Sequence, residues 1–303
     1  MVSIIFQQVL LQDKSVIDEF LHAKRYESSI CSFTNFYMWR GPYHIEWAIV
    51  EECLCVKASH HDHQYMLFPF AKANGNVAAA LTAMLDHFAE QGQSFSLKGV
   101  SVESKAELEA LRPGYFSFVA DRDNYDYVYL AEDLMWLKGR KFSSKKNHLN
   151  SFKRSYSQYQ YLPLTADLLP SCLETALEWY AMRGMDKNSE IELEKAAVVD
   201  ILHHYDVLGL SGGAILIDGK MEAFSIGEQL NDDTALIHVE KGNPNIRGVY
   251  QVINQEFCRN RWSDMKYINR EEDMGIDGLR QAKESYHPIK LVEKYDVLLA
   301  TKG

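Results

Sequence analysis

The feature that most constrains the fold is an order of local patterns that occurs twice: strand, helix, hairpin, strand, helix, strand. Strand patterns of the first copy lie at 4–11, 47–50, 54–56, 65–70 and 94–100, with helical patterns at 16–21 and 77–90. Those of the second copy lie at 159–164, 213–217, 221–226, 234–240 and 265–269, with helical patterns at 166–177 and 249–261. Asp218-Gly219 between two apolar runs is a strong hairpin signal. The repeat predicts two similar units of mixed α/β structure.

Composition agrees with a globular chain of two ordinary domains. Of 303 residues, 47% are hydrophobic and 24% are charged. No run approaches the roughly 18 apolar residues of a membrane span, so we expect no integral membrane segment, and no signal peptide is evident. Five cysteines at irregular spacing indicate neither a disulfide framework nor a zinc site, so we expect reduced thiols, a cytoplasmic location and no bound metal.

A basic segment from Lys138 to Arg154 stands out because the net charge of the chain is −10. The segment contains no acidic residue, and apolar residues near one helical face predict an amphipathic helix. Such a helix can simply join two domains in solvent. It can also cradle phosphates of a nucleotide cofactor or of tRNA, in which case Lys145 and Lys146 are the candidate ligands.

A strand-to-helix turn at Arg247-Gly248 is a second candidate anion site. Free backbone N–H groups and the positive end of the helix dipole favour an anion there. Gly248 would let a pyrophosphate approach the backbone closely. The other interpretation is an ordinary strand–helix turn.

The strand 234–240 carries titratable groups toward its carboxyl end, where ligands bind in many α/β sheets. Strict alternation places Leu236, His238 and Glu240 on one face, with Glu222 and Glu228 beside them on the neighbouring strand. His238 or Glu240 could there accept a proton from an attacking amine. A polar sheet face or a structural hydrogen bond is the alternative.

A dense polar loop, Asn269-Arg270-Glu271-Glu272-Asp273, follows a predicted buried strand. A short helix comes next and Pro288 ends it. Five consecutive polar residues are unusual for a connector, so we expect the loop to form one wall of a pocket. Lys283 and Tyr286 of the short helix would then face a substrate together with Arg270.

Other candidates are less specific. His60, His61 and His63 precede a strand pattern and can form a metal site or a polar turn. The helix end from Trp179 through Tyr180 to Arg183 can cap a pocket or pack in a core.

Three stretches together carry a resemblance: Lys145–Phe152, His238–Lys241, and Asn269–Gly275 with its continuation through Gly278, Arg280, Lys283, Tyr286, Pro288 and Lys294-Tyr295. They resemble the C-terminal domain family of phosphatidylglycerol lysyltransferases and, more distantly, the Fem-type aminoacyltransferases. The resemblance implies two tandem GNAT-like (acyl-CoA N-acyltransferase-like) domains of α/β class, with mixed central sheets flanked by helices. We expect them at residues 1–137 and 138–303. The second would hold the active site, because segment 69–76 of the first has no Arg-Gly equivalent.

Three functions follow from these expectations. The first is transfer of an aminoacyl group from aminoacyl-tRNA to an amine or hydroxyl of a small molecule, lipid or peptide. The second is acyl-CoA-dependent N-acyl transfer, and the third is a binding module without catalysis. For an enzyme without a tightly bound cofactor, the candidate catalytic, donor-binding and substrate-binding residues are respectively His238, Glu240 and Asn269; Arg247, Gly248, Lys145 and Lys146; and Glu222, Glu228, Arg270, Lys283 and Tyr286.

Overall fold

The computed structural model describes residues 4–60, 63–182 and 190–301, and its chain divides into two compact units. Unit 1 comprises residues 1–126, 272–276 and 292–303, and unit 2 comprises residues 127–271 and 277–291. Each unit is a mixed sheet with flanking helices, as the sequence predicts. Within the described ranges, no helix is long and apolar enough to cross a bilayer.

Unit 1 is built on an eight-stranded sheet in which the path β1-β2-β3-β4-β6-β15-β7 is joined by β5, which pairs with β3. Its strands are β1 (Gln7–Gln8), β2 (Glu46–Val50), β3 (Cys53–His60), β4 (His63–Met66), β5 (Phe70–Ala71), β6 (Ser96–Val100), β7 (Phe116–Ala120) and β15 (Tyr295–Leu299). Its α-helices are α1 (Lys14–Leu21), α2 (Phe33–Trp39), α3 (Val77–Glu90) and α4 (Val102–Leu111). The Asn76 side chain caps α3 by accepting from the Ala79 N–H, and the apolar stripe of α3, including Leu81, Met84 and Phe88, packs into the core.

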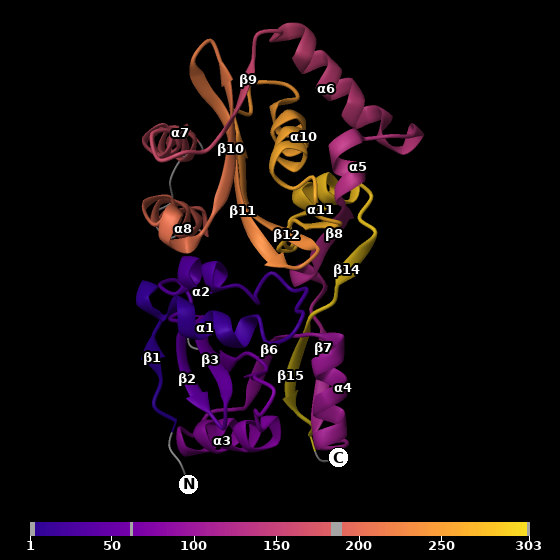
Figure 1. Ribbon diagram of the computed structural model, residues 1–303. Coiled ribbons are helices and arrows are strands. Elements are labelled where there is room, and N and C mark those ends of the chain that lie inside the picture. The colour runs from indigo at the N-terminus through magenta and orange to yellow at the C-terminus, as the bar shows by residue number, and fades with distance from the viewer. Residues whose placement is uncertain (1–3, 61–62, 183–189, 302–303) are drawn as a thin grey trace. The chain divides into compact units, whose positions relative to one another are not determined.

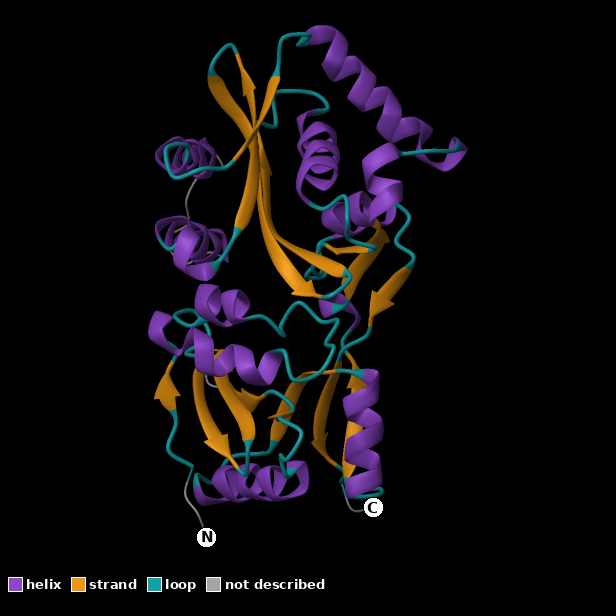
Figure 2. Ribbon diagram, viewed as in Figure 1, coloured by secondary structure: helices purple, strands orange, loops and turns teal. Residues whose placement is uncertain are grey.

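Unit 2 contains a seven-stranded sheet in the order β14-β8-β13-β12-β11-β10-β9. Its strands are β8 (Asp126–Leu130), β9 (Gln160–Pro163), β10 (Ser211–Ile217), β11 (Lys220–Asn231), β12 (Thr234–Gly242), β13 (Tyr267–Asn269) and β14 (Lys290–Val292). Its α-helices are α5 (Ala131–Trp136), α6 (Ser143–Ser155), α7 (Leu169–Met182), α8 (Glu190–His203), α9 (Tyr205–Leu208), α10 (Val249–Arg261) and α11 (Asp277–Glu284). Helix α10 packs on one face of the long strands, and α7 and α8 lie on the other (Figure 1 and Figure 2).

The two units exchange one strand each, and this corrects the predicted domain boundary. β15, from the end of the chain, lies between β6 and β7 in unit 1. β8, which precedes the second repeat, lies between β14 and β13 in unit 2. A cut between residues 137 and 138 would therefore remove a strand from the interior of each sheet.

The sheet of unit 2 opens between β12 and β13. These strands are parallel and pair only at Thr234–Tyr267, Ala235–Ile268 and Leu236–Asn269. β12 then continues to Gly242 with β11 as its partner, while the chain after β13 turns into the polar loop. The carboxyl ends of two parallel strands thus diverge, which makes room for side chains between them.

Candidate active site

A β-bulge at His238 decides which face each polar residue of β12 occupies. In the β11–β12 ladder two successive pairs skip His238, which makes it an extra residue on its strand. A bulge shifts the alternation of faces beyond it, so the prediction that Leu236, His238 and Glu240 share one face is wrong. Glu240 lies on the face that α10 covers, where Asn254 donates to it. Leu236 lies on the other face, because its neighbours Ala235 and Ile237 pack with Phe257 of α10.

His238 is held between two carboxylates. Its Nδ1 lies 2.9 Å from Oε1 of Glu271 and its Nε2 lies 2.8 Å from Oε1 of Glu228, and its side chain is 0% exposed. Burial by itself lowers the pKa of an imidazole, but the two hydrogen-bonded carboxylates outweigh it and raise the pKa of His238 to about 10. At neutral pH the ring is therefore a cation that donates both N–H groups, and it is not a proton acceptor.

Glu271 reaches His238 because the loop turns sharply at this residue, whose φ is +56°. The N–H of Glu271 donates to Oδ1 of the fully buried Asn269 at 2.8 Å. The buried Lys283 donates to the carbonyl oxygens of Arg270 and Glu271 at 2.5 and 3.0 Å. In these contacts Asn269 and Lys283 hold the shape of the loop.

Arg270 points to the opposite side of the loop, toward α10. Its Nη2 donates to Oε1 of Glu240 at 2.8 Å, and its guanidinium carbon lies 5.6 and 4.9 Å from the ring centroids of Tyr129 and Tyr286. Asn254 of α10 donates to Oε2 of Glu240 at 3.1 Å. Two aromatic contacts and an ion pair thus fix the guanidinium in one position.

Two buried atoms of this cluster have no hydrogen-bond partner in the described structure: Nη1 of Arg270, a donor, and Oδ1 of Asn254, an acceptor. An unsatisfied buried polar atom costs about 1–3 kcal/mol, so each such atom calls for a reason. Both atoms belong to groups that contact Glu240. The cluster therefore presents an unused donor and an unused acceptor beside one carboxylate.

Lys145 of α6 faces the same cluster. Its Nζ lies 4.1 Å from the ring centroid of Tyr286. Its partial burial and the positive charge of Arg270 lower the pKa of Lys145 to about 8, against an opposing effect of Glu240. Near neutral pH a useful fraction of this lysine is an uncharged amine. The sequence predicts Lys145 as a phosphate ligand. No local pattern in the sequence indicates that Lys145 lies near Arg270.

The predicted anion site at the start of α10 is packed against α6. Gly248 has a φ of +89°, and a Cβ at this position would lie 2.5 Å from the carbonyl oxygen of His148 and 3.0 Å from Cβ of Phe152. The sequence predicts that a pyrophosphate approaches the backbone closely at Gly248. In the structure, α6 makes this close approach instead. Arg247, the next residue back, is exposed.

Gly248→Ala is expected to lower the free energy of unfolding by about 1–3 kcal/mol from backbone strain, with a further loss from the clash with α6. Gly209→Ala is the matched control, because Gly209 also has a positive φ of +74° but a Cβ there meets nothing within 4 Å. Urea unfolding of both variants measures the difference. Equal losses would show that α6 does not require the glycine.

Only one of the two predicted glutamates of β11 joins the His238 cluster. Glu228 contacts His238, whereas Glu222 accepts from Nδ2 of Asn243 at 2.8 Å and its carbonyl accepts from the Asn243 N–H at 2.9 Å. Glu222 thus anchors the loop that leads into α10.

The predicted amphipathic basic helix is confirmed as α6, which buries Leu149 and Phe152. Part of the basic charge in this region is neutralised by carboxylates, in the pairs Lys138–Glu132, Lys141–Asp133 and Lys153–Glu256. Arg140, Lys146 and Arg154 make no ion pair with any carboxylate that the structure describes. These three cations remain available to an anionic partner.

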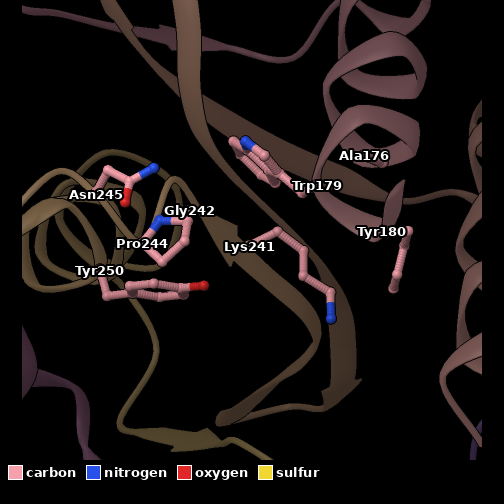
Figure 3. A pocket seen from close by; sticks show the side chains of 8 residues that line it. All are labelled: Ala176, Trp179, Tyr180, Lys241, Gly242, Pro244, Asn245 and Tyr250. Carbon is pink, nitrogen blue, oxygen red and sulfur yellow. The ribbon is translucent and has the colours of Figure 1, made fainter. Parts of the chain in front are cut away.

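A pocket of about 370 Å³ lies at the end of β12 on the side of α7. Figure 3 shows Trp179 and Tyr180 reaching it from α7, Lys241 from β12 and Tyr250 from α10. Trp179 also stacks on Phe224 with an interplanar angle of 9°. The helix end that was expected either to cap a pocket or to pack in a core therefore does both, and Arg183 lies outside the described residues.

The remaining candidates do not form a site in the described ranges. His60 and His63 pair across a hairpin, and His61 lies outside those ranges. No group of described histidine, cysteine and carboxylate side chains is arranged to hold a metal ion. The five cysteines are buried and free.

Comparison with known proteins identifies the family of the chain. A family model described as "Phosphatidylglycerol lysyltransferase, C-terminal" matches residues 23–298. The chain belongs to this family. The match extends over both units of the chain, whereas the motifs that carry the resemblance in the sequence lie only in the second half.

Solved structures share the fold of this member of the phosphatidylglycerol lysyltransferase C-terminal family. A conserved protein of unknown function from Bacteroides thetaiotaomicron VPI-5482 is 36% identical, covers 98% of this chain and 100% of its own, and superposes with a TM-score of 0.92. L-PGS from Bacillus licheniformis, at 12% identity, has a TM-score of 0.67 over 96% of this chain and 93% of its own. A tandem GNAT protein from the clavulanic acid biosynthesis pathway, at 9% identity, has a TM-score of 0.51 over 99% and 100%. The tandem GNAT-like fold is thereby confirmed.

A relative is also found among Mycoplasmoides gallisepticum proteins. It is an uncharacterized protein that is 24% identical over 190 residues, which is 62% of this chain. The aligned part spans 61% of the length of that relative.

Proposed function

We propose that unit 2 transfers an aminoacyl group from aminoacyl-tRNA to an amine or hydroxyl acceptor. The observation that carries the proposal is the unused donor and acceptor beside Glu240, on Arg270 and Asn254. An aminoacyl ester presents a carbonyl oxygen, which accepts, and an α-ammonium, which donates. An acetyl group lacks the ammonium and would leave the Asn254 oxygen unpaired.

In the proposed reaction Arg270 stabilises charge and Lys145 moves a proton. The acceptor nitrogen or oxygen attacks the ester carbonyl, and Nη1 of Arg270 donates to the oxyanion that develops. Lys145, as the free amine, takes the proton of the acceptor. When the carbon–oxygen bond to the ribose breaks, Lys145 returns that proton to the ribose oxygen, so the lysine ends as it began.

Helix α6 supports tRNA over acyl-CoA as the donor. Arg140, Lys146 and Arg154 are unpaired cations that suit a phosphate backbone, and the backbone approach at Gly248 is already filled by His148. The acceptor is a small molecule, a lipid or a peptide. No tightly bound cofactor is needed.

The pH dependence of transfer is expected to rise through about pH 8 as Lys145 loses its proton. Lys145→Arg keeps a positive charge but cannot act as a base near this pH. The rise of the rate near pH 8 should therefore vanish in this variant, and the rate should fall by about 10²–10⁴-fold. Lys146→Arg is the matched control on the same helix and should keep the rise near pH 8. If the rise persists in Lys145→Arg, another group transfers the proton.

A transfer assay tests the reaction class. Total tRNA charged with radiolabelled amino acids is incubated with the protein and, in separate arms, with micelles of extracted bacterial phospholipid or with a mixture of small amines. We expect label to leave the tRNA faster than by spontaneous hydrolysis and to appear in a new amide or ester. Consumption of acetyl-CoA in a parallel reaction, with charged tRNA decaying only at its spontaneous rate, would overturn the proposal.

A further inference from the structure

We propose that Lys294 of unit 1 is a positioning residue for the aminoacyl transfer. Together with Asp126 it holds Glu272, and Glu272 in turn fixes the sharp turn of the polar loop that presents Arg270. This inference rests on the proposed function, because it concerns the geometry of the same loop. Lys294, Asp126 and Glu272 all belong to unit 1, and we name their ion cluster the clasp.

The ammonium of Lys294 is surrounded by three oxygen atoms, which match its three N–H donors. Its Nζ lies 2.6 Å from Oδ1 of Asp126, 3.3 Å from Oγ of Ser29 and 3.5 Å from Oε2 of Glu272. The side chains of Lys294 and Asp126 are 3% and 0% exposed. Asp126 also accepts from the N–H and the hydroxyl of Ser29, at 2.7 and 2.8 Å. The lysine is therefore held in one position.

The buried charges of the clasp indicate a role beyond stability. Removing an ammonium and a carboxylate from water is costly, and apolar side chains of similar volume often stabilise a core as well or better. A buried ion cluster can instead specify one arrangement of the chain. In the clasp, the group whose position is specified is the carboxylate of Glu272, because Glu272 is the member that belongs to the polar loop.

The turn just before Glu272 has to be held by its surroundings. Glu271 has a φ of +56°, a strained conformation for a residue with a side chain. Within unit 2, Lys283 donates to the carbonyl of Glu271, and Asn269 accepts from its N–H. On the other side of the turn the next residue is Glu272, which the clasp holds. The backbone that carries Arg270 and Glu271 is therefore fixed at both ends.

The clasp is also connected to the loop through β8. Asp126 begins β8. The backbone of the next residue, Tyr127, pairs with Arg270 and Glu271, at 3.0 and 3.1 Å between nitrogen and oxygen. Lys294 thus joins the residue before Tyr127 to the residue after Glu271. A displacement of about 1 Å at a reacting group can lower a rate by about 10²-fold, so a small shift of this backbone matters for Arg270.

The ring protons of His238 report the position of Glu271 without any substrate. The Nδ1–H donates to Glu271 and the Nε2–H donates to Glu228 on β11. Nuclear magnetic resonance of the isotope-labelled ring therefore gives one signal for the loop and one for the sheet. In Glu272→Ala we expect the Nδ1–H signal to move upfield and to exchange with water about tenfold faster or more. The Nε2–H signal should stay unchanged.

Steady-state kinetics of aminoacyl transfer give the second readout. In Glu272→Ala we expect kcat to fall by about 10–10²-fold, with a smaller change in KM, because the loop presents Arg270 and other parts of the protein bind the donor. Leu81→Ala is the control. Leu81 is a fully buried core residue of α3, so its truncation weakens unit 1 without changing a contact of the loop. This variant should keep kcat and both ring signals.

A double variant separates positioning from simple stabilisation. Asp126→Asn combined with Lys294→Met removes both buried charges together, so neither is left without its partner and the fold should persist. Nothing in the clasp then holds Glu272. We expect the double variant to unfold at nearly the urea concentration of the unmodified protein and still to show the Nδ1–H change. Glu272→Ala is decisive if the double variant fails to fold, because Glu272 is partly exposed.

Unchanged ring signals in Glu272→Ala, or changed signals with an unchanged kcat, would overturn the positioning role. So would a folded double variant that keeps the signals and the kcat of the unmodified protein. A changed Nδ1–H signal in a protein that transfers no aminoacyl group would show that the clasp positions the loop and would overturn the proposed function. The two failures are therefore distinct.

Discussion

Replacing Arg270 with lysine is expected to lower kcat for aminoacyl transfer by about 10²–10³-fold, with a smaller effect on KM. Lysine keeps a positive charge for Glu240 but has no second planar N–H group in the position of Nη1. The donor to the oxyanion is thereby lost, while the ground-state contacts of the substrate elsewhere remain. Single-turnover transfer from charged tRNA measures the effect without a contribution from product release.

Arg261→Lys is the matched control for this prediction. Arg261 is an exposed residue of α10 whose Nε donates to Oγ of Ser211 at 2.8 Å, outside the reactive cluster. We expect its kcat to match that of the unmodified protein. If Arg270→Lys instead raised KM and left kcat unchanged, Arg270 would bind the substrate without stabilising the transition state.

Replacing His238 with phenylalanine is expected to lower the free energy of unfolding at pH 7 by about 3–5 kcal/mol. The substitution keeps a ring of similar size but leaves Glu228 and Glu271 facing one another without the cation that they share. Urea unfolding measures the loss. His204→Phe is the control, because His204 pairs with Asp200 at a partly exposed position, where an ion pair contributes about 0–1 kcal/mol.

The stabilisation by His238 has a predicted pH window. Its pKa is about 10 in the folded chain and about 6.5 when unfolded. A raised folded pKa stabilises fully below the unfolded value and loses its effect as the pH rises through the folded value. The difference between the unmodified protein and His238→Phe should therefore shrink between pH 7 and pH 10. A constant difference would show that His238 is neutral in the fold.

Local patterns predicted most of the elements because each carries its own signal. The stripe at 77–90 matches α3, the stripe at 249–261 matches α10, and the Asp218-Gly219 turn joins β10 to β11 as expected. The exchange of β8 and β15 had no such signal. β15 pairs with β6, with Tyr295 opposite Val100, and nothing in either strand records a partner so distant in the chain.

The candidate site was predicted as a set of residues but not as an arrangement. The polar loop does lie beside the end of β12, and its Arg270 and Glu271 contact Glu240 and His238. The bulge at His238 separates the two contacts onto opposite faces, and a single inserted residue in a ladder leaves no mark in an apolar–polar pattern. The sequence does not predict Asn254 as a site residue, because the role of a polar residue on the buried face of a helix can be inferred only when its hydrogen-bond partner is known. That partner is Glu240.

The polar residues of the loop contact different partners, which explains why the loop contains so many charged residues. Beyond Arg270 and Glu271, the loop enters unit 1, where Glu272 lies 3.5 Å from Nζ of Lys294 and Asp273 lies 3.3 Å from Arg122. Lys294 is buried and also pairs with the fully buried Asp126 at 2.6 Å. Only the first part of the loop therefore belongs to the proposed reaction site.

The most direct test of the proposed donor is recognition of the α-ammonium group. Two stable mimics are compared by calorimetry: CpCpA with an aminoacyl amide at its 3′ end, and the same compound acetylated at the α-nitrogen. A hydrogen bond to a charged group contributes about 1.5–3 kcal/mol, so the free amine should bind about tenfold or more tightly. That preference should disappear in Asn254→Leu. Equal binding of the two mimics, or tighter binding of the acetylated one, would contradict an aminoacyl site at Glu240, Asn254 and Arg270.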